Sequence, residues 1–291
     1  MRRPTGSAPP QGSATLGNGK KPKGAGPVLT ERTRQRKAAA ELGIQGADYD
    51  KSVVLTQLAI LFARHRRLGA EIAFKGGAVL RMAHEAPRFS KDLDGSAVAK
   101  KEIKMEWLHE VLEENERRNG GFVMGGYQVI KQARRIHTQG LVCNAPSGRE
   151  VPVSIEFNWH EPLLMPDIEW LEVEAPTVGK QAIPAMNRVE RAAEKVRAFL
   201  DRALGADAYD LYFFGDKVLS AAHFELVRPL LPRKFEYNAA LRGVTDYRAL
   251  FDQRLAESER SYRSGAAVIS GDPPDWEVIR AALEPWRELL P

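Results

Sequence analysis

Two neighbouring segments, FKGGAVLR at residues 74–81 and RFSKDLD at residues 88–94, decide what this chain can fold into. The first opens on the end of a short apolar run and continues through the double glycine Gly76-Gly77 into residues that suit one or two helical turns. A loop follows, and the second segment then enters a run with the character of a strand. The order predicted is therefore strand, glycine turn, helix, loop and strand.

The double glycine and the acidic strand together suit phosphate and metal binding. Glycines let the backbone approach a bulky group, and the free N–H groups and dipole at a helix start favour an anion such as phosphate. In a strand, Asp92 and Asp94 project from the same face. Like charges held this close favour a cation between them, and oxygen ligands suit Mg²⁺. A phosphate cradle beside such a carboxylate pair predicts phosphoryl or nucleotidyl transfer.

Composition predicts a globular, cytoplasmic protein with one large or two medium domains. The 291 residues are 43% hydrophobic and 28% charged, which is ordinary for a soluble protein. No apolar run approaches the roughly twenty residues that a membrane span requires, and no secretory signal is recognisable. The single cysteine, Cys143, rules out an internal disulfide and a zinc site built from cysteines.

The net charge of +5 is confined to the N-terminal part of the sequence. Residues 1–40 hold nine basic side chains and one acidic side chain, whereas the other 251 residues hold 34 basic and 37 acidic ones. Residues 1–28, rich in Gly, Pro, Ser and Lys, are predicted to be a disordered basic tail. It would serve either as a solubilising extension or as an electrostatic arm for nucleic acid. Any RNA binding by the rest of the chain has to come from local patches.

Hydrophobic periodicity divides the rest of the chain into a mixed first part and a helical second part. We expect a core domain over residues 29–180 and a helical domain over residues 181–291. Strand-like patterns are predicted at 122–145, 151–159 and 168–173, and helical patterns at 48–68, 101–118, 186–204, 246–255 and 276–290.

Residues 151–159, VPVSIEFNW, have the clearest alternation in the chain. Five apolar side chains share one face and are expected to be buried: Val151, Val153, Ile155, Phe157 and Trp159. Glu156 stands on the opposite face. It is either an ordinary exposed strand residue or the third carboxylate of a metal site, and we favour the latter because two aspartates leave a two-metal site short of ligands.

The predicted helix at 186–204 carries a basic stripe of Arg188, Arg191, Lys195 and Arg202. One interpretation is a solvated face in which these cations pair with Glu190 and Glu194. The other is a surface that contacts phosphate groups. The residues of the helix alone leave both interpretations open.

The two motif blocks resemble those of the AbiEii-type nucleotidyltransferase toxins, a branch of the polymerase-beta-like nucleotidyltransferase superfamily. The first block is Lys-Gly-Gly followed by Arg-x-Ser-x-Asp-Leu-Asp, and the second is Glu-Lys-x-Arg-Ala followed by residues 207–210, Asp-Ala-Tyr-Asp. A lone Gly-Gly or Asp-x-Asp is typical of an ordinary turn. The resemblance implies an α/β (α+β) fold in which a small mixed sheet carries the site and a helical C-terminal region completes it.

The resemblance also implies roles for individual residues. Metal ligands for two Mg²⁺ ions would be Asp92, Asp94 and Glu156. Lys195 would contact nucleotide phosphates and Asp210 would complete the catalytic set, whereas the role of Asp207 stays open. The nucleotide and its phosphates would be bound by Lys75, Gly76, Gly77, Arg88 and Ser90.

The function implied by the resemblance is transfer of a nucleoside monophosphate from an NTP to an RNA, with the 3′ end of tRNA as the leading acceptor. The family further implies the toxin of a toxin–antitoxin or phage-defence system, with a cognate antitoxin as partner. Two alternatives stay open at this point: nucleotidyl or phosphoryl transfer to a protein, and a non-catalytic module that binds RNA or nucleotide.

Overall fold

The computed structural model of the chain describes residues 46–99, 101–176, 178–265 and 269–291. The predicted tail at residues 1–28 lies outside this range. Within it, the first half of the chain builds a seven-stranded mixed sheet in the order β3-β4-β7-β2-β1-β9-β8. The strands are β1 (Ile72–Lys75), β2 (Asp92–Ala97), β3 (Gln128–Gln132), β4 (Arg135–Gln139), β7 (Ser154–Asn158), β8 (Glu169–Ala175) and β9 (Gly179–Ala185).

The predicted order of strand, turn, helix and strand is confirmed around the double glycine. β1 leads directly into α4 (Gly76–His84), and β2 then returns antiparallel to β1. Gly76 has a φ of 80°, a left-handed conformation that favours glycine. On either side of this unit the pairing is parallel, between β2 and β7 and between β1 and β9.

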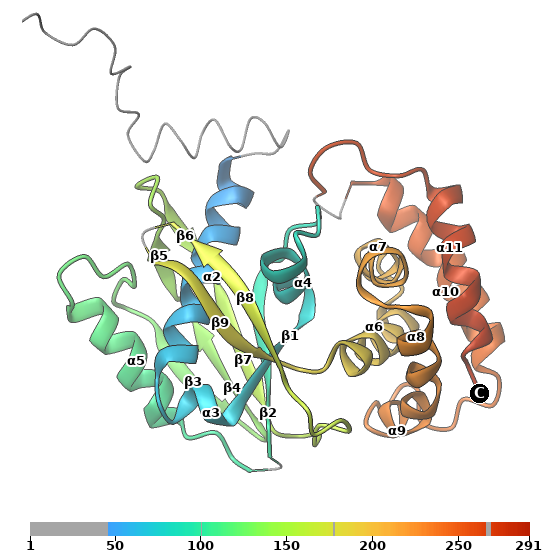
Figure 1. Cartoon of the computed structure of the whole chain (residues 1–291), viewed down its shortest axis with the longest axis horizontal. Helices are drawn as coiled ribbons and strands as arrows, with labels where there is room; N and C mark the ends of the chain where they lie inside the picture. The colour runs from blue at the N-terminus through green and yellow to red at the C-terminus, as the bar shows by residue number, and fades with distance from the viewer. Residues whose placement is uncertain (1–45, 100, 177, 266–268) are drawn as a thin grey trace, which may run out of the picture.

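Helices α2 (Gly46–Arg64), α3 (Leu68–Glu71) and α5 (Met105–Arg117) pack with the sheet (Figure 1). The helix predicted at 48–68 is α2, which ends at Arg64, and α3 begins only at Leu68; the helix predicted at 101–118 is α5, which is shorter. At the centre of this lobe Phe157 makes edge-on ring contacts with Phe62 and Phe74, at centroid distances of 5.6 and 6.1 Å. These aromatic contacts fix the strands that carry the acidic residues.

The strand predicted over residues 151–159 is divided between two sheets. Its start is β6 (Glu150–Pro152), which pairs with β5 (Val142–Asn144) in a separate hairpin, whereas β7 pairs with β2 and β4. Pro152 has no N–H to donate, which makes it a natural end for a strand. The predicted burial is confirmed, because all five apolar side chains of the alternation are at most 8% exposed.

The second half of the chain forms a helical lobe beside the sheet lobe (Figure 1). A second hydrophobic cluster unites its helices: α6 (Arg188–Arg202), α7 (Gly205–Phe213), the π-helical turn Phe214–Val218, α8 (Ala221–Val227), the 3₁₀ turn Arg228–Leu230, α9 (Leu231–Glu236), α10 (Tyr247–Arg263) and α11 (Trp276–Glu288). Leu80 and Ala86, from α4 and the turn after it, belong to this second cluster. The α4 segment therefore joins the lobes.

The chain leaves the first cluster at Ala185 and enters the second at Val189. The domain boundary expected at residues 180/181 falls inside β9. Among the described residues, no helix has both the length and the apolar character needed to cross a membrane.

Candidate active site

Three acidic side chains share one face of the sheet near the cleft between the lobes. In the parallel register of β2 and β7, Asp94 lies beside Glu156 and Asp92 beside Ser154. Burial raises the pKa of Asp94, and the negative charges of Asp92 and Glu156 raise it further, while Lys75 and Lys195 oppose them. The strand pairing thus places the three carboxylates at neighbouring positions of two paired strands.

Their chemistry fits a hard divalent cation, because carboxylate oxygens on adjacent strands are typical ligands of Mg²⁺. In the described part of the chain, however, no three side chains of the His, Cys, Asp and Glu types are close enough to hold an ion. Glu156 instead faces Arg135, with 3.3 Å between carboxylate oxygen and guanidinium nitrogen. This pair is half exposed on both sides, so Glu156 can exchange Arg135 for another cation at low cost.

The double glycine makes room for two charged side chains. A Cβ on Gly76 would lie 2.8 Å from the Asp94 carboxylate, and a Cβ on Gly77 would lie 2.1 Å from a guanidinium nitrogen of Arg88. Both distances are too short for a real contact. The N-terminus of α4 therefore lies against the Asp94 carboxylate of β2 and the Arg88 guanidinium group of the loop before β2. Ser90, in that same loop, donates a hydrogen bond to the carbonyl of Asp92 at 3.2 Å.

Asp210 connects this loop to the helical lobe. Its carboxylate accepts two hydrogen bonds from Arg88, at 2.6 and 2.8 Å, and lies 2.6 Å from the Lys195 ammonium group. Burial alone would raise the pKa of Asp210, but the two cations lower it below its usual value. Asp210 is 1% exposed, and through these contacts it holds the side chains of Arg88 and Lys195 in place. Asp207, one turn earlier on α7, binds Arg202 through both of its oxygens.

The basic stripe of α6 is not a uniformly solvated face. Arg191 and Lys195 are 2% and 9% exposed. Arg191 donates to Glu169 at 3.0 Å and contacts the ring of His84, so its environment is structural. Lys195 faces the cleft. The interpretation of the stripe as a solvated surface is therefore wrong for these two residues.

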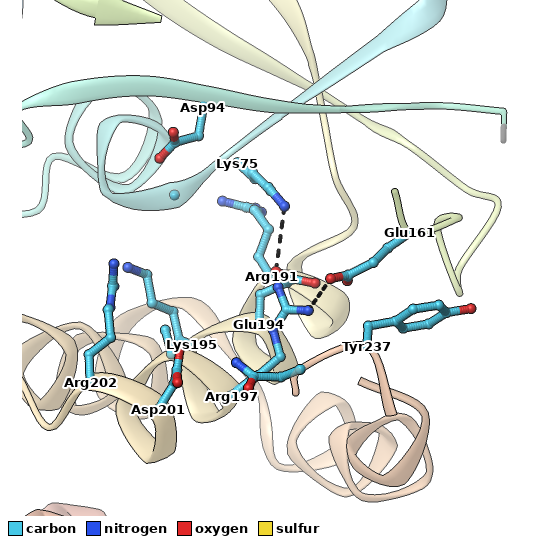
Figure 2. A pocket seen from close by; sticks show the side chains of 13 residues that line it. Lys75, Asp94, Glu161, Arg191, Glu194, Lys195, Arg197, Asp201, Arg202 and Tyr237 are labelled. Atoms are coloured by element: carbon cyan, nitrogen blue, oxygen red, sulfur yellow. Dashed lines mark hydrogen bonds and ion pairs between the residues drawn. The ribbon is translucent and has the colours of Figure 1, made fainter. Parts of the chain in front are cut away.

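A buried charged network lies beneath the cleft and was not expected from the sequence. Lys234 on α9 lies 2.7 Å from Glu190 and 2.6 Å from Glu194, and Glu194 lies 3.5 Å from Lys75. Arg197 pairs with Glu194 and with Glu161 (Figure 2). The network connects the sheet lobe, α6 and α9, so it fixes Lys75 next to Asp94.

Two cavities meet at the carboxylate Asp94. One, of 310 Å³, extends from Lys75, Gly76 and Asp94 past α6 to the end of α9 (Figure 2). The other, of 420 Å³, extends along Gly77, Arg88, Ser90 and Asp92 toward α7. Asp94, Lys195 and Arg202 line both cavities. Glu156 lines neither of these two.

The fold is similar to that of solved structures of other proteins. The nucleotidyltransferase toxin MenT4 from Mycobacterium tuberculosis is 24% identical and has a TM-score of 0.62, with 86% of this chain and 88% of that chain covered. JHP933 from Helicobacter pylori is 13% identical with a TM-score of 0.45, covering 75% of this chain and 95% of that chain. The likeness to MenT4 shows the fold. None of the curated proteins matches the sequence.

The family match covers both motif blocks and both lobes. Residues 59–287 match the family described as "Nucleotidyl transferase AbiEii toxin, Type IV TA system". This span contains the glycine pair, the three carboxylates and the buried Lys195–Asp210 pair. The chain therefore belongs to the AbiEii family of toxins of type IV toxin–antitoxin systems, and it is a nucleotidyltransferase.

Proposed function

We propose that the protein transfers a nucleoside monophosphate from an NTP to the 3′ end of an RNA, with a tRNA as the acceptor, and that Asp92, Asp94 and Glu156 hold Mg²⁺ during transfer. The observation that carries the proposal is the position of Asp94. It lies beside Glu156 in the sheet, against the N-terminus of α4, and at the junction of two cavities.

In this reaction the acceptor hydroxyl forms a new bond to the α-phosphorus, the bond from that phosphorus to the β-phosphate breaks, and pyrophosphate leaves with the hydroxyl proton released. The metal, when bound, neutralises negative charge on the phosphate oxygens. Gly77, Ser90 and Lys195 are placed to contact phosphate oxygens, and Asp210 keeps Lys195 and Arg88 at the cleft. These preorganised donors need little rearrangement as charge shifts toward the leaving group.

The acceptor side of the site is the β3–β4 hairpin. His137 of β4 lies beside Glu156 in the register, and the hairpin carries three exposed cations: Lys131 in β3, Arg134 in the turn and Arg135 in β4. Lys131 pairs with Glu102 and Arg135 with Glu156, whereas Arg134 forms no ion pair with another described residue. A small basic surface next to Glu156 suits the phosphates of an RNA whose terminal hydroxyl has to reach the α-phosphate.

Labelling with α-³²P-NTPs tests the proposal. The wild-type protein is incubated with each of the four NTPs and Mg²⁺, with tRNA in one reaction and lysate protein in another. We expect metal-dependent label at the 3′ end of the RNA. Asp94→Asn and Glu156→Gln should each lose about 10²–10³ in rate, as is typical when one electrostatic contact of a transition state is removed.

Glu172→Gln is the matched control, because Glu172 is an exposed strand carboxylate whose one ion pair among the described residues is with Lys180 at 3.1 Å. It should label RNA at the wild-type rate. Expressed without an antitoxin, the wild type and Glu172→Gln should arrest growth and Asp94→Asn should permit it. Label on protein alone would contradict an RNA acceptor. A rate for Asp94→Asn above about a tenth of wild type, equivalent to some 1.4 kcal/mol of barrier, would contradict the metal assignment.

A further inference from the structure

The 310 Å³ cavity has a far end to which none of the roles above is assigned. Tyr237, at the end of α9, and Asn238, in the turn that follows, line this end. In Figure 2 the Tyr237 ring lies beyond Glu161 and Arg197, away from Asp94. An occupant that reached from Asp94 to this ring would pass between the two lobes.

Both cavities are lined by five cations and four carboxylates, but they differ in how the cations are paired, and this difference assigns each cavity to one half of an NTP. In the 310 Å³ cavity the cations are already neutralised, since Lys75 pairs with Glu194 and Arg197 pairs with Glu194 and Glu161. In the 420 Å³ cavity, Lys51 and Lys91 form no ion pair with any described residue. The second cavity therefore suits a polyanionic phosphate chain, and the first suits an uncharged group.

We infer that Tyr237 and Asn238 form the nucleobase subsite, with the triphosphate in the 420 Å³ cavity and the α-phosphate at Asp94. The inference rests on the proposed function, because it assumes that an NTP occupies the cleft. It adds Tyr237 and Asn238, which directly follow α9 and carry no motif of the family resemblance, as determinants of nucleotide binding.

Tyr237 has the properties of a stacking platform. Its ring is half exposed, and an edge-on contact with the His160 ring, at a centroid distance of 6.2 Å, holds it in place. Any of the four bases can stack on an aromatic face. Tyr237 accordingly supplies affinity for the base rather than selection among bases.

Asn238 supplies a single directed hydrogen-bond donor. Its side-chain oxygen accepts hydrogen bonds from the backbone N–H groups of Ala240, at 2.8 Å, and Leu241, at 3.3 Å. No described residue accepts a hydrogen bond from its amide NH₂ group, which is therefore available to a ligand. An NH₂ donor recognises a carbonyl or ring-nitrogen acceptor on the base edge, so Asn238 contributes to the choice of base.

Calorimetric binding of the four NTPs and of inorganic tripolyphosphate, with Ca²⁺ in place of Mg²⁺ to prevent turnover, tests the inference. The wild type should bind at least one NTP more tightly than tripolyphosphate. Tyr237→Ala should weaken binding of that NTP by about 5- to 150-fold, the effect of losing one stacked base, and leave the affinity for tripolyphosphate unchanged. Tyr237→Phe should restore NTP binding relative to Tyr237→Ala. Trp170→Ala is the control, because Trp170 is 61% exposed on the edge strand β8 and should have no effect.

Asn238→Asp provides a second variant that preserves the turn. A carboxylate oxygen can still accept the two backbone hydrogen bonds, while the NH₂ donor is replaced by a negatively charged acceptor. The preference of the protein among the four NTPs should then change. The inference is overturned if Tyr237→Ala leaves NTP affinity intact or lowers NTP and tripolyphosphate affinity equally, if Asn238→Asp leaves the preference unchanged, or if the wild type binds no NTP more tightly than tripolyphosphate. A wild type that binds neither would overturn the proposed function itself.

Discussion

Lys234 is a lysine of which only 1% is exposed, and three carboxylates surround its ammonium group. Burial opposes its charge, but Glu194 and Glu190 raise its pKa above the usual value. The same contacts hold the pKa of Glu194 well below its usual range, against its burial and with the help of Lys75. Both partners therefore stay charged at neutral pH, and the cavity beside Asp94 is built on a fixed ion network.

Replacing Lys234 by methionine should disrupt the ion network rather than merely weaken it. Among the described residues Lys234 is the only cation paired with the buried Glu190, whereas Glu194 keeps Lys75 and Arg197. The substitution therefore leaves the Glu190 charge uncompensated, and such a buried charge destabilises a fold by roughly 3–5 kcal/mol. Urea denaturation should show a lower midpoint with an unchanged slope.

Lys180→Met is the matched control, since Lys180 and its partner Glu172 are both largely exposed, and it should leave the midpoint where it is. Equal midpoints for the two variants would show that the buried network contributes no stability.

The local part of this site could be predicted, and the network could not. Asp92 and Asp94 share a face because the side chains of a strand alternate with a two-residue period. Their sequence positions and this one rule are enough to predict that they lie together. Lys234 stands in an otherwise unremarkable helix, and its partners lie 40 and 44 residues earlier in the chain. Glu190 and Glu194 have the spacing of surface helix pairs. Only the packing of α9 against α6 reveals that they are buried.

At the scale of elements, the start of α4 depends on the absence of side chains. A Cβ at residue 77 would occupy the position of the Arg88 guanidinium group, which is itself bound by Asp210 on α7. The glycine therefore permits a contact between three elements: β1–α4, the loop before β2, and α7.

Gly77→Ala should displace Arg88 and reduce transfer while the fold persists. Displacing Arg88 breaks its two hydrogen bonds to the buried Asp210, so thermal stability should fall as well as activity, although Lys195 still pairs with Asp210 and limits the loss of stability. If the effect acts through Arg88, Gly77→Ala should cost little further activity in an Arg88→Ala background. Gly46→Ala is the control, because a Cβ there meets only an ordinary contact at 3.6 Å. Additive losses in the double variant would show that the backbone of Gly77 acts on the phosphate directly.

Strand β9 shows where element prediction from sequence fails. Its residues, GKQAIPA, begin with polar side chains and include Pro184, so neither alternation nor β propensity identifies them. The strand exists because it pairs with β8 over its whole length and meets β1 at the register pair of Phe74 with Ala185. By contrast, residues 151–159, which include β7, have five apolar positions in strict alternation, and their burial was predicted correctly.

At the scale of the whole molecule, the cleft lies between the two hydrophobic clusters, and charged residues of the two lobes pair across it. Lys75 reaches Glu194, and Arg88 reaches Asp210, each pair joining the sheet lobe to the helical lobe. A nucleotide in the cleft would contact both lobes, and so would be released whenever either lobe unfolds. Binding should accordingly stabilise residues far from the cleft, provided that the lobes unfold together.

Cys143 allows this cooperativity to be measured without a mutation. It is fully buried in β5, within the sheet-lobe cluster, and burial raises the pKa of its thiol to about 12. At pH 8 the Cys143 thiol of the folded protein is therefore both inaccessible to reagents and protonated. A disulfide reagent can label it only after the lobe opens. When closing is faster than labelling, the labelling rate follows the open population.

We expect an NTP at a concentration of about 100 Kd, added with Ca²⁺, to slow labelling of Cys143 roughly 100-fold, because the open state binds no nucleotide. Asp94→Asn, which should bind the nucleotide and metal less tightly, serves as the comparison and should show a smaller reduction at the same NTP concentration. Labelling that is equally fast with and without NTP, while calorimetry shows binding, would mean that the β5–β6 hairpin opens without disturbing the cleft. In that case the sheet lobe would unfold in parts, and the ion pairs across the cleft would not couple the hairpin to the helical lobe.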